Sequence, residues 1–169
     1  TSLGRGGQNQ PIAARQWSSG FLPSRYQGVH LRGKGEPVMY LGNPAGVSRD
    51  DQGDIIAAVN ALNAFFLNDV GATEIATRIA QYEMAFKMQT SVPDLADISK
   101  EPKDVLDLYG PEVTQPGSFA YNCLLARRMA ERGVPFSQVF QRGWDHHGNL
   151  PGSIRQLVKA VDQPSAGLV

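Results

Sequence analysis

The most informative part of the chain is Val134-Pro-Phe-Ser-Gln-Val-Phe-Gln-Arg-Gly-Trp-Asp-His-His-Gly-Asn149. It has the pattern of a short apolar strand that runs into a polar turn, and the turn carries Asp145, His146 and His147. A helical pattern precedes it and another follows it, and the order helix, strand, turn, helix is typical of half of a wound α/β layer. Because ligands in such layers bind beyond the carboxyl ends of strands, the stretch predicts an α/β fold with a ligand site at the turn.

The turn carries the residue types of a metal site. Asp145 and His147 are two residues apart, so in an extended turn their side chains point the same way and can reach one ion. Carboxylate oxygen and imidazole nitrogen suit zinc, manganese or iron better than a thiolate-preferring metal. We therefore expect a divalent metal, with calcium and magnesium as further candidates for its identity. His146 and Asn149 are the other candidate site residues.

Two ligands do not complete such a site, because a catalytic zinc typically has three protein ligands and an open position. The only other histidine is His30, and its one acidic neighbour in the sequence is Glu36. We expect most ligands of a metal site to lie outside the turn.

A purely structural interpretation fits the same spacing. In it, Asp145 or Asn149 caps the following helix, His146 is solvated, and His147 packs with one satisfied hydrogen bond. Trp144 would then be a packing residue beneath the turn. A short Asp-x-His pattern also arises by chance, so the spacing alone leaves both interpretations open.

Composition bounds the class of protein. The chain is 41% hydrophobic and 19% charged, a composition that is ordinary for a globular protein. Its 169 residues are enough for one domain. The 16 basic and 16 acidic residues cancel, so there is no electrostatic footprint for nucleic acid or an anionic membrane. No apolar run approaches the roughly 20 residues that span a bilayer. The single cysteine, Cys123, excludes an internal disulfide and a thiolate zinc cluster, and we expect it to be buried and inert.

The first 53 residues are rich in Gly, Pro, Ser, Gln and Asn, and strand-like runs cover 28–32 and 37–41. We expect a loop-rich segment there. Arg25, Arg32 and Lys34 could bind a sulfate or phosphate oxygen, although scattered basic residues in a loop are usually only solvated.

Helical periodicity dominates the rest of the chain. The pattern predicts a helix capped by Asp54 whose apolar residues, such as Ile55 and Leu62, face the core, with a stop at Gly71. A second helix begins near Thr73. Pro93 and three later prolines are expected to divide the following stretch into short helical pieces.

Three more helices are predicted in the second half. One covers 103–109, one is capped by Ser118 and runs through Arg132 to a stop at Gly133, and one follows the Asp-His-His turn. The middle one has a narrow face of mostly small residues, which we expect to approach a sheet. These residues are Phe119, Cys123, Ala126 and Ala130.

Several motifs in register resemble the bacterial family known as domain of unknown function 1501, which is especially abundant in planctomycete-like bacteria. The resemblance covers nearly the whole chain. It rests on Gly20-Phe-Leu-Pro-Ser-Arg-Tyr-Gln-Gly-Val29, Tyr82-Glu-Met-Ala-Phe-Lys-Met-Gln-Thr-Ser-Val-Pro93, Leu108-Tyr-Gly110, Asn122-Cys-Leu-Leu-Ala-Arg-Arg128, Gly143-Trp-Asp-His-His-Gly-Asn149 and Asp162-Gln-Pro164.

That family is similar to sulfatases and alkaline phosphatases, which are metal-dependent hydrolases built as an α/β/α sandwich around a mixed sheet. The resemblance implies that a partial sandwich of this kind is the fold, and that the Trp-Asp-x-His turn brings Asp145 and His147, followed by Asn149, to a metal centre. Members usually carry an export signal, so the resemblance also implies an exported protein. Family members have further motifs before Thr1 and after Val169, so we expect residues 1–169 to be one internal fragment of a larger domain.

Two functions follow as hypotheses. The first is an exported metal-dependent hydrolase that acts on a sulfate or phosphate ester of a small molecule or polysaccharide, with Asp145 and His147 as metal ligands. The second is an exported binding or assembly protein that keeps the fold without catalysis.

Overall fold

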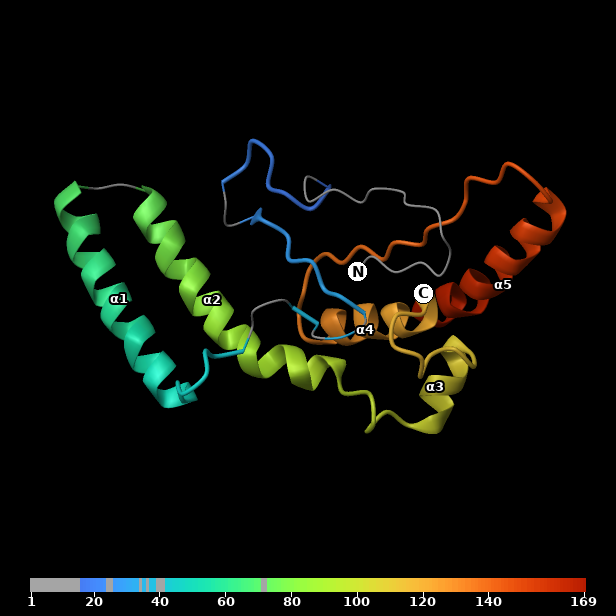
Figure 1. Cartoon of the computed structure of the whole chain (residues 1–169), viewed down its shortest axis with the longest axis horizontal. Helices are drawn as coiled ribbons and strands as arrows, with labels where there is room; N and C mark the ends of the chain where they lie inside the picture. The colour runs from blue at the N-terminus through green and yellow to red at the C-terminus, as the bar shows by residue number, and fades with distance from the viewer. Residues whose placement is uncertain (1–15, 24–25, 34, 36, 39–41, 71–72) are drawn as a thin grey trace. The chain divides into compact units, whose positions relative to one another are not determined.

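The computed structural model describes residues 16–23, 26–33, 35, 37–38, 42–70 and 73–169 (Figure 1). Two compact units divide the chain: His30–Pro37 belongs with Leu95–Val169 in one unit, and Ala14–Val29 belongs with Val38–Asp94 in the other. No helix in the described part of the chain is both long and apolar enough to cross a membrane. The helices in these ranges are α1 (Arg49–Val70), α2 (Thr73–Ala96), α3 (Lys103–Tyr109), α4 (Phe119–Glu131) and α5 (Leu150–Leu168).

The predicted α/β sandwich is wrong for the described residues, which are helical and contain no sheet. The predicted strand from Val134 is wrong: the extended segment between α4 and α5 (Figure 1) has only an isolated β-bridge at Phe140. Val134 and Phe136 are exposed rather than buried in a sheet. An apolar pattern can predict that a segment is extended, but a sheet also requires a neighbouring strand to pair with it.

Helix α4 is the centre of its unit. Ser118 caps it as predicted, since the Ser118 hydroxyl accepts a hydrogen bond from the Tyr121 amide at 2.9 Å. Every residue from Ala120 to Ala126 is buried, so α4 is covered on more than one side. The core around it consists of Tyr109, Val113, Ala120, Cys123 and Leu124.

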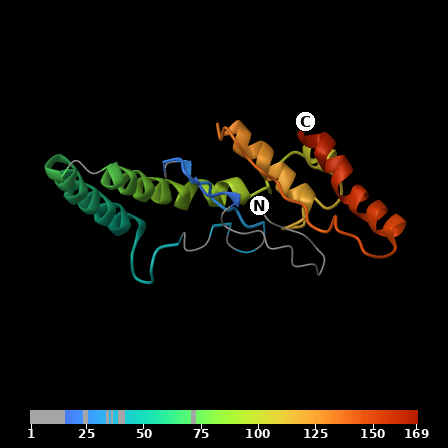
Figure 2. The same ribbon diagram turned by 90° about the horizontal axis from the view of Figure 1, so that it is seen from above.

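Part of the α4 face that was expected to approach a sheet packs against a helix instead: Phe119 and Cys123 belong to the cluster that contains Tyr109 of α3, whereas Ala130 is exposed. Helices α5 and α3 lie against α4, and Figures 1 and 2 show α5 beside it in both views. Small residues permit close approach of any neighbour, so their spacing does not distinguish a helix from a sheet. Cys123 is buried as predicted, and burial raises the pKa of its thiol to about 12.

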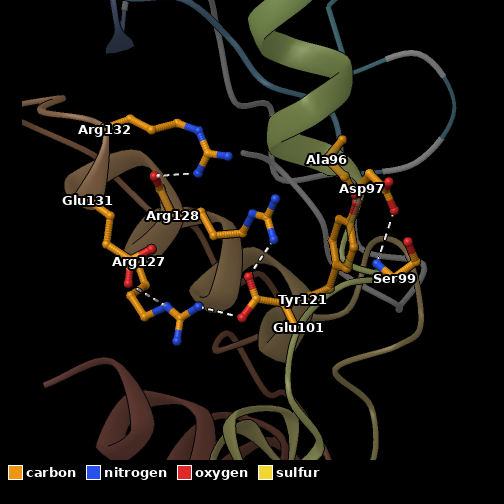
Figure 3. Close-up of polar contacts among 9 residues, drawn as sticks. All are labelled: Ala96, Asp97, Ser99, Glu101, Tyr121, Arg127, Arg128, Glu131 and Arg132. Carbon is orange, nitrogen blue, oxygen red and sulfur yellow. Dashed lines mark hydrogen bonds and ion pairs between the residues drawn. The ribbon is translucent and has the colours of Figure 1, made fainter.

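Glu101 joins the segment before α3 to α4 (Figure 3). Its carboxylate accepts hydrogen bonds from Arg127, at 2.6 Å, and from Arg128. The side chains of Glu101 and Arg128 are only 11% and 8% exposed. Burial by itself would raise the pKa of Glu101, but the hydrogen bonds and charges of the two arginines outweigh it and hold the pKa below 4.5.

Glycines let α5 approach α3. A Cβ on Gly167 would lie 2.9 Å from the carbonyl oxygen of Leu108, and a Cβ on Gly110 would lie 2.7 Å from Oε1 of Gln163. Gln163 in turn donates a hydrogen bond to the Asp107 carbonyl at 2.9 Å, which covers the end of α3. The contact therefore depends on backbone surfaces that only glycine exposes.

In the other unit, α1 begins at Arg49, five residues before the predicted start at Asp54. Ser48 and Asp51 form a reciprocal cap: the Asp51 amide donates to the Ser48 hydroxyl at 3.1 Å, and the Ser48 amide donates to the Asp51 carboxylate at 3.0 Å. The Arg49 guanidinium lies 5.4 Å from the centre of the Phe86 ring on α2.

Two further predictions in this region are corrected. Ile55 and Leu62 are exposed on α1 rather than core-facing. Pro93 does not end a helix but lies in the last turn of α2, where the loss of one amide hydrogen bond affects little of the helix. The predicted stop at Gly71 lies outside the described residues.

We expect Glu101→Gln to destabilise the fold by about 3 kcal/mol, because it removes the carboxylate charge that the buried Arg128 and the neighbouring Arg127 contact. The pKa of Glu101 is depressed in the folded state, so its contribution is present above about pH 4.5 and is lost as the pH falls through the folded pKa. Urea unfolding at several pH values should therefore show a flatter acid dependence in the variant. Glu131→Gln is the matched control, because its carboxylate pairs with Arg127 at 3.3 Å but is 55% exposed. A loss as large in the control as in Glu101→Gln would contradict this assignment.

We expect Gly167→Ala to destabilise the fold by about 1–2 kcal/mol, because the added methyl group would push α5 away from the α3 backbone. Alanine has a higher helix propensity than glycine, so without a clash the substitution would stabilise α5. A loss of stability would therefore report the steric clash. Gly148→Ala is the control, since nothing lies within 4 Å of its added Cβ. Thermal unfolding of the two variants measures the difference, and equal midpoints would argue against close α3–α5 packing.

Candidate functional site

Asp145 and His147 lie on an exposed turn between the extended segment and α5. The His147 Nε2 atom lies 3.1 Å from Asp145 Oδ1, within hydrogen-bonding distance, and the side chains are 79% and 59% exposed. The two side chains therefore point the same way. Their role as metal ligands stays a prediction.

Local backbone geometry builds the turn. Gly143 has φ 92°, a conformation that favours glycine, and a Cβ there would lie 3.3 Å from Leu157 on α5. Asn149 begins α5 from a left-handed conformation with φ 45°. The Asn149 carbonyl then accepts the amides of Gly152 and Ser153, at 3.1 and 3.0 Å. Asp145 and His147 thus lie on a turn that begins and ends at residues with a positive φ angle, Gly143 and Asn149.

The structural interpretation of the turn fails in three places. Asn149 occupies the capping position of α5 but makes no capping hydrogen bond with its side chain. His147, expected to pack, is largely exposed, whereas His146, expected to be solvated, has a buried Nε2 atom without a partner among the described residues. Trp144 is exposed rather than packed beneath the turn. Side chains of neighbouring residues in a turn need not alternate as they do in a strand, which explains the reversal of the two histidines.

The two side chains are slightly closer than two ligands of one zinc ion would be. Tetrahedral zinc bonds of about 2.0–2.2 Å to imidazole nitrogen and carboxylate oxygen place neighbouring donors roughly 3.4 Å apart. Asp145 Oδ1 and His147 Nε2 are separated by 3.1 Å. No group of three His, Cys, Asp or Glu side chains that could hold a metal ion occurs within the ranges that the structure describes.

A basic residue that the sequence analysis did not single out lies beside the turn. Arg142 is half-buried, and its Nε atom is buried without a hydrogen-bond partner among the described residues. Burial lowers the pKa of His30, and the positive charges of Arg32 and Arg142 lower it further. From the sequence, only the position of Arg142 three residues before Asp145 could have drawn attention to it. Its effect on His30 could not be predicted, because the two residues are far apart in the sequence.

Comparison with known proteins gives a family without a known activity. The family described as "Protein of unknown function (DUF1501)" matches residues 1–169. No curated protein and no solved structure matches the chain. Because the match covers the full length of the sequence, the chain belongs to the DUF1501 family.

Proposed function

We propose that the protein is a metal-dependent hydrolase of sulfate or phosphate esters in which Asp145 and His147 hold a divalent ion. The observation that carries the proposal is the 3.1 Å approach of a carboxylate oxygen and an imidazole nitrogen on an exposed turn. The reaction class comes from the similarity of the DUF1501 family, whose pattern includes this Trp-Asp-x-His turn, to sulfatases and alkaline phosphatases. The proposal does not depend on a shared sheet.

Each residue has a defined task in this function. Asp145 offers an anionic oxygen, and His147 offers Nε2 as a neutral donor once that nitrogen carries no proton. A bound ion would polarise the ester and lower the pKa of a water molecule. The exposure of both side chains gives a small-molecule or polysaccharide ester direct access to the turn.

The remaining ligands and the nucleophile belong to parts of the protein outside this turn. Zinc, manganese, calcium and magnesium all remain candidates for the ion, since carboxylate and imidazole do not select one of them. Export of the protein, also suggested by the resemblance, is part of the same proposal.

A second candidate is a non-catalytic binding or assembly protein. One observation favours it: Asp145 and His147 already satisfy each other through their own contact, as a structural pair would. Exposed apolar side chains such as Phe21, Phe65 and Phe136 are also of the type found at protein interfaces.

We expect the full-length protein to contain stoichiometric metal, and Asp145→Ala with His147→Ala to lower metal affinity by about 10-fold or more, because two of its ligands are lost. Elemental mass spectrometry after dialysis measures the content. Asp162→Ala, which removes an exposed carboxylate from α5, is the control and should keep the metal. Equal metal content in the double variant and the wild type would refute the assigned role.

The same proteins separate the two functions. Hydrolysis of aryl sulfates or aryl phosphates by the wild type, lost in the double variant and kept in Asp162→Ala, is the result expected for a hydrolase. Absence of metal and of hydrolysis in the wild type would favour the binding protein.

A further inference from the structure

One side of α1 has the reverse of the polarity pattern of an ordinary surface helix. Between residues 55 and 65 every exposed residue is apolar, whereas the two polar residues, Asn60 and Asn63, are less exposed. Asn60 Oδ1 is buried without a hydrogen-bond partner among the described residues. A surface helix normally turns its polar residues to water. The exposed residues, which we call the outer face, are Ile55, Ala57, Ala58, Ala61, Leu62, Ala64 and Phe65.

The opposite side of α1 contacts α2. A Cβ on Gly53 would lie 3.3 Å from the Phe86 ring of α2, and the Arg49 guanidinium lies near the same ring. Asn60 is seven residues after Gly53, two turns further along the same side of the helix. The side with the polar residues therefore packs within the protein, and the apolar outer face is left exposed.

Four residues of the outer face follow the spacing of a helix–helix seam. Ile55, Ala58, Leu62 and Phe65 are separated by three, four and three residues, which aligns them along about 15 Å of the helix. The three large side chains are 50%, 59% and 68% exposed. Ala58, Ala61, Leu62 and Phe65 have the i, i+3, i+4 and i+7 spacing of the four residues that surround a side chain of a facing helix. The outer face therefore suits another helix.

Charge determines which kind of helix fits. Asp51 and Asp54 are exposed at the N-terminal end of the seam, and α1 has no basic residue after Arg49. A second copy of α1 in the same direction would bring these two acidic residues beside their equivalents. In the opposite direction it would bring them towards Asp69 near the other end of the helix. Like charges that face each other are unfavourable, so a basic helix fits better than a second copy or an anionic lipid surface.

We propose that the outer face of α1 binds an amphipathic helix of another protein, with an apolar seam flanked by lysine or arginine. Removal of Leu62 and Phe65 from water would supply most of the affinity, as in other complexes in which a helix packs its apolar face on a partner. Asp51 and Asp54 would select the basic partner and its orientation. The inference is independent of metal binding by Asp145.

The test uses the full-length protein and two fluorescein-labelled synthetic peptides of three heptads with leucine at the seam positions. One peptide carries lysine at the flanking positions, and the other carries glutamate there. Fluorescence anisotropy at low ionic strength measures both affinities. We expect the lysine peptide to bind about 10-fold more tightly or better, because opposite charges across an interface select the partner. Asp54→Lys should weaken binding of the lysine peptide and strengthen binding of the glutamate peptide.

Two substitutions on the outer face test the packing. Leu62→Gln should weaken binding of the lysine peptide by about 10-fold or more, because it removes an apolar side chain from the contact. Ala58→Leu should also weaken it, although the face becomes more apolar, because the larger side chain takes the space of the incoming one. Non-specific adsorption would not show this loss. Val158→Gln, at an exposed apolar residue of α5, is the matched control and should bind like the wild type.

Absence of binding, equal affinity for the two peptides, or no effect of Leu62→Gln and Ala58→Leu overturns the inference. Sedimentation of the protein alone tests for a second copy: a dimer that Leu62→Gln dissociates would assign the outer face to self-association instead. Binding to phosphatidylcholine vesicles that Leu62→Gln abolishes would assign it to lipid. Asp145→Ala with His147→Ala should bind the lysine peptide like the wild type, so failure of the metal proposal is seen separately.

Discussion

The carboxylate of Glu101 lies between Arg127 and Arg128, two consecutive residues of the helix at the centre of its unit. Removing a carboxylate and a guanidinium from water is unfavourable, and their attraction offsets this only when the geometry is good and the remaining donors are satisfied. Figure 3 shows two further contacts of these arginines: Glu131 approaches Arg127 at 3.3 Å, and the Arg128 carbonyl accepts a hydrogen bond from Arg132. The segment that leads into α3 is thereby tied to α4.

The core of this unit follows from that arrangement. With α4 held from the side of Glu101, its apolar residues meet Tyr109 and Val113 from the α3 region, and α5 packs against both helices. The glycine contacts between α3 and α5 then set how closely these helices approach. Buried charge and close backbone packing thus act together, since a displaced α5 would also expose the surroundings of α4.

The candidate site differs physically from this interior. Asp145 and His147 form a contact in water, where an ion pair contributes little to stability, so the pair is available to exchange its partner for a ligand. Arg142, which is half-buried and three residues before Asp145, lies beside the same turn.

Local features could be read from the residues alone. The short helix over 103–109, the Ser118 cap, the Gly133 stop and the common direction of Asp145 and His147 all depend on interactions within a few residues, which propensity and spacing describe well. The missing sheet and the effect of the Arg142 charge on His30 depend on contacts between distant segments. An apolar pattern predicts that a segment is buried, but it does not predict which segment packs against it. Only the tertiary structure could therefore show these contacts.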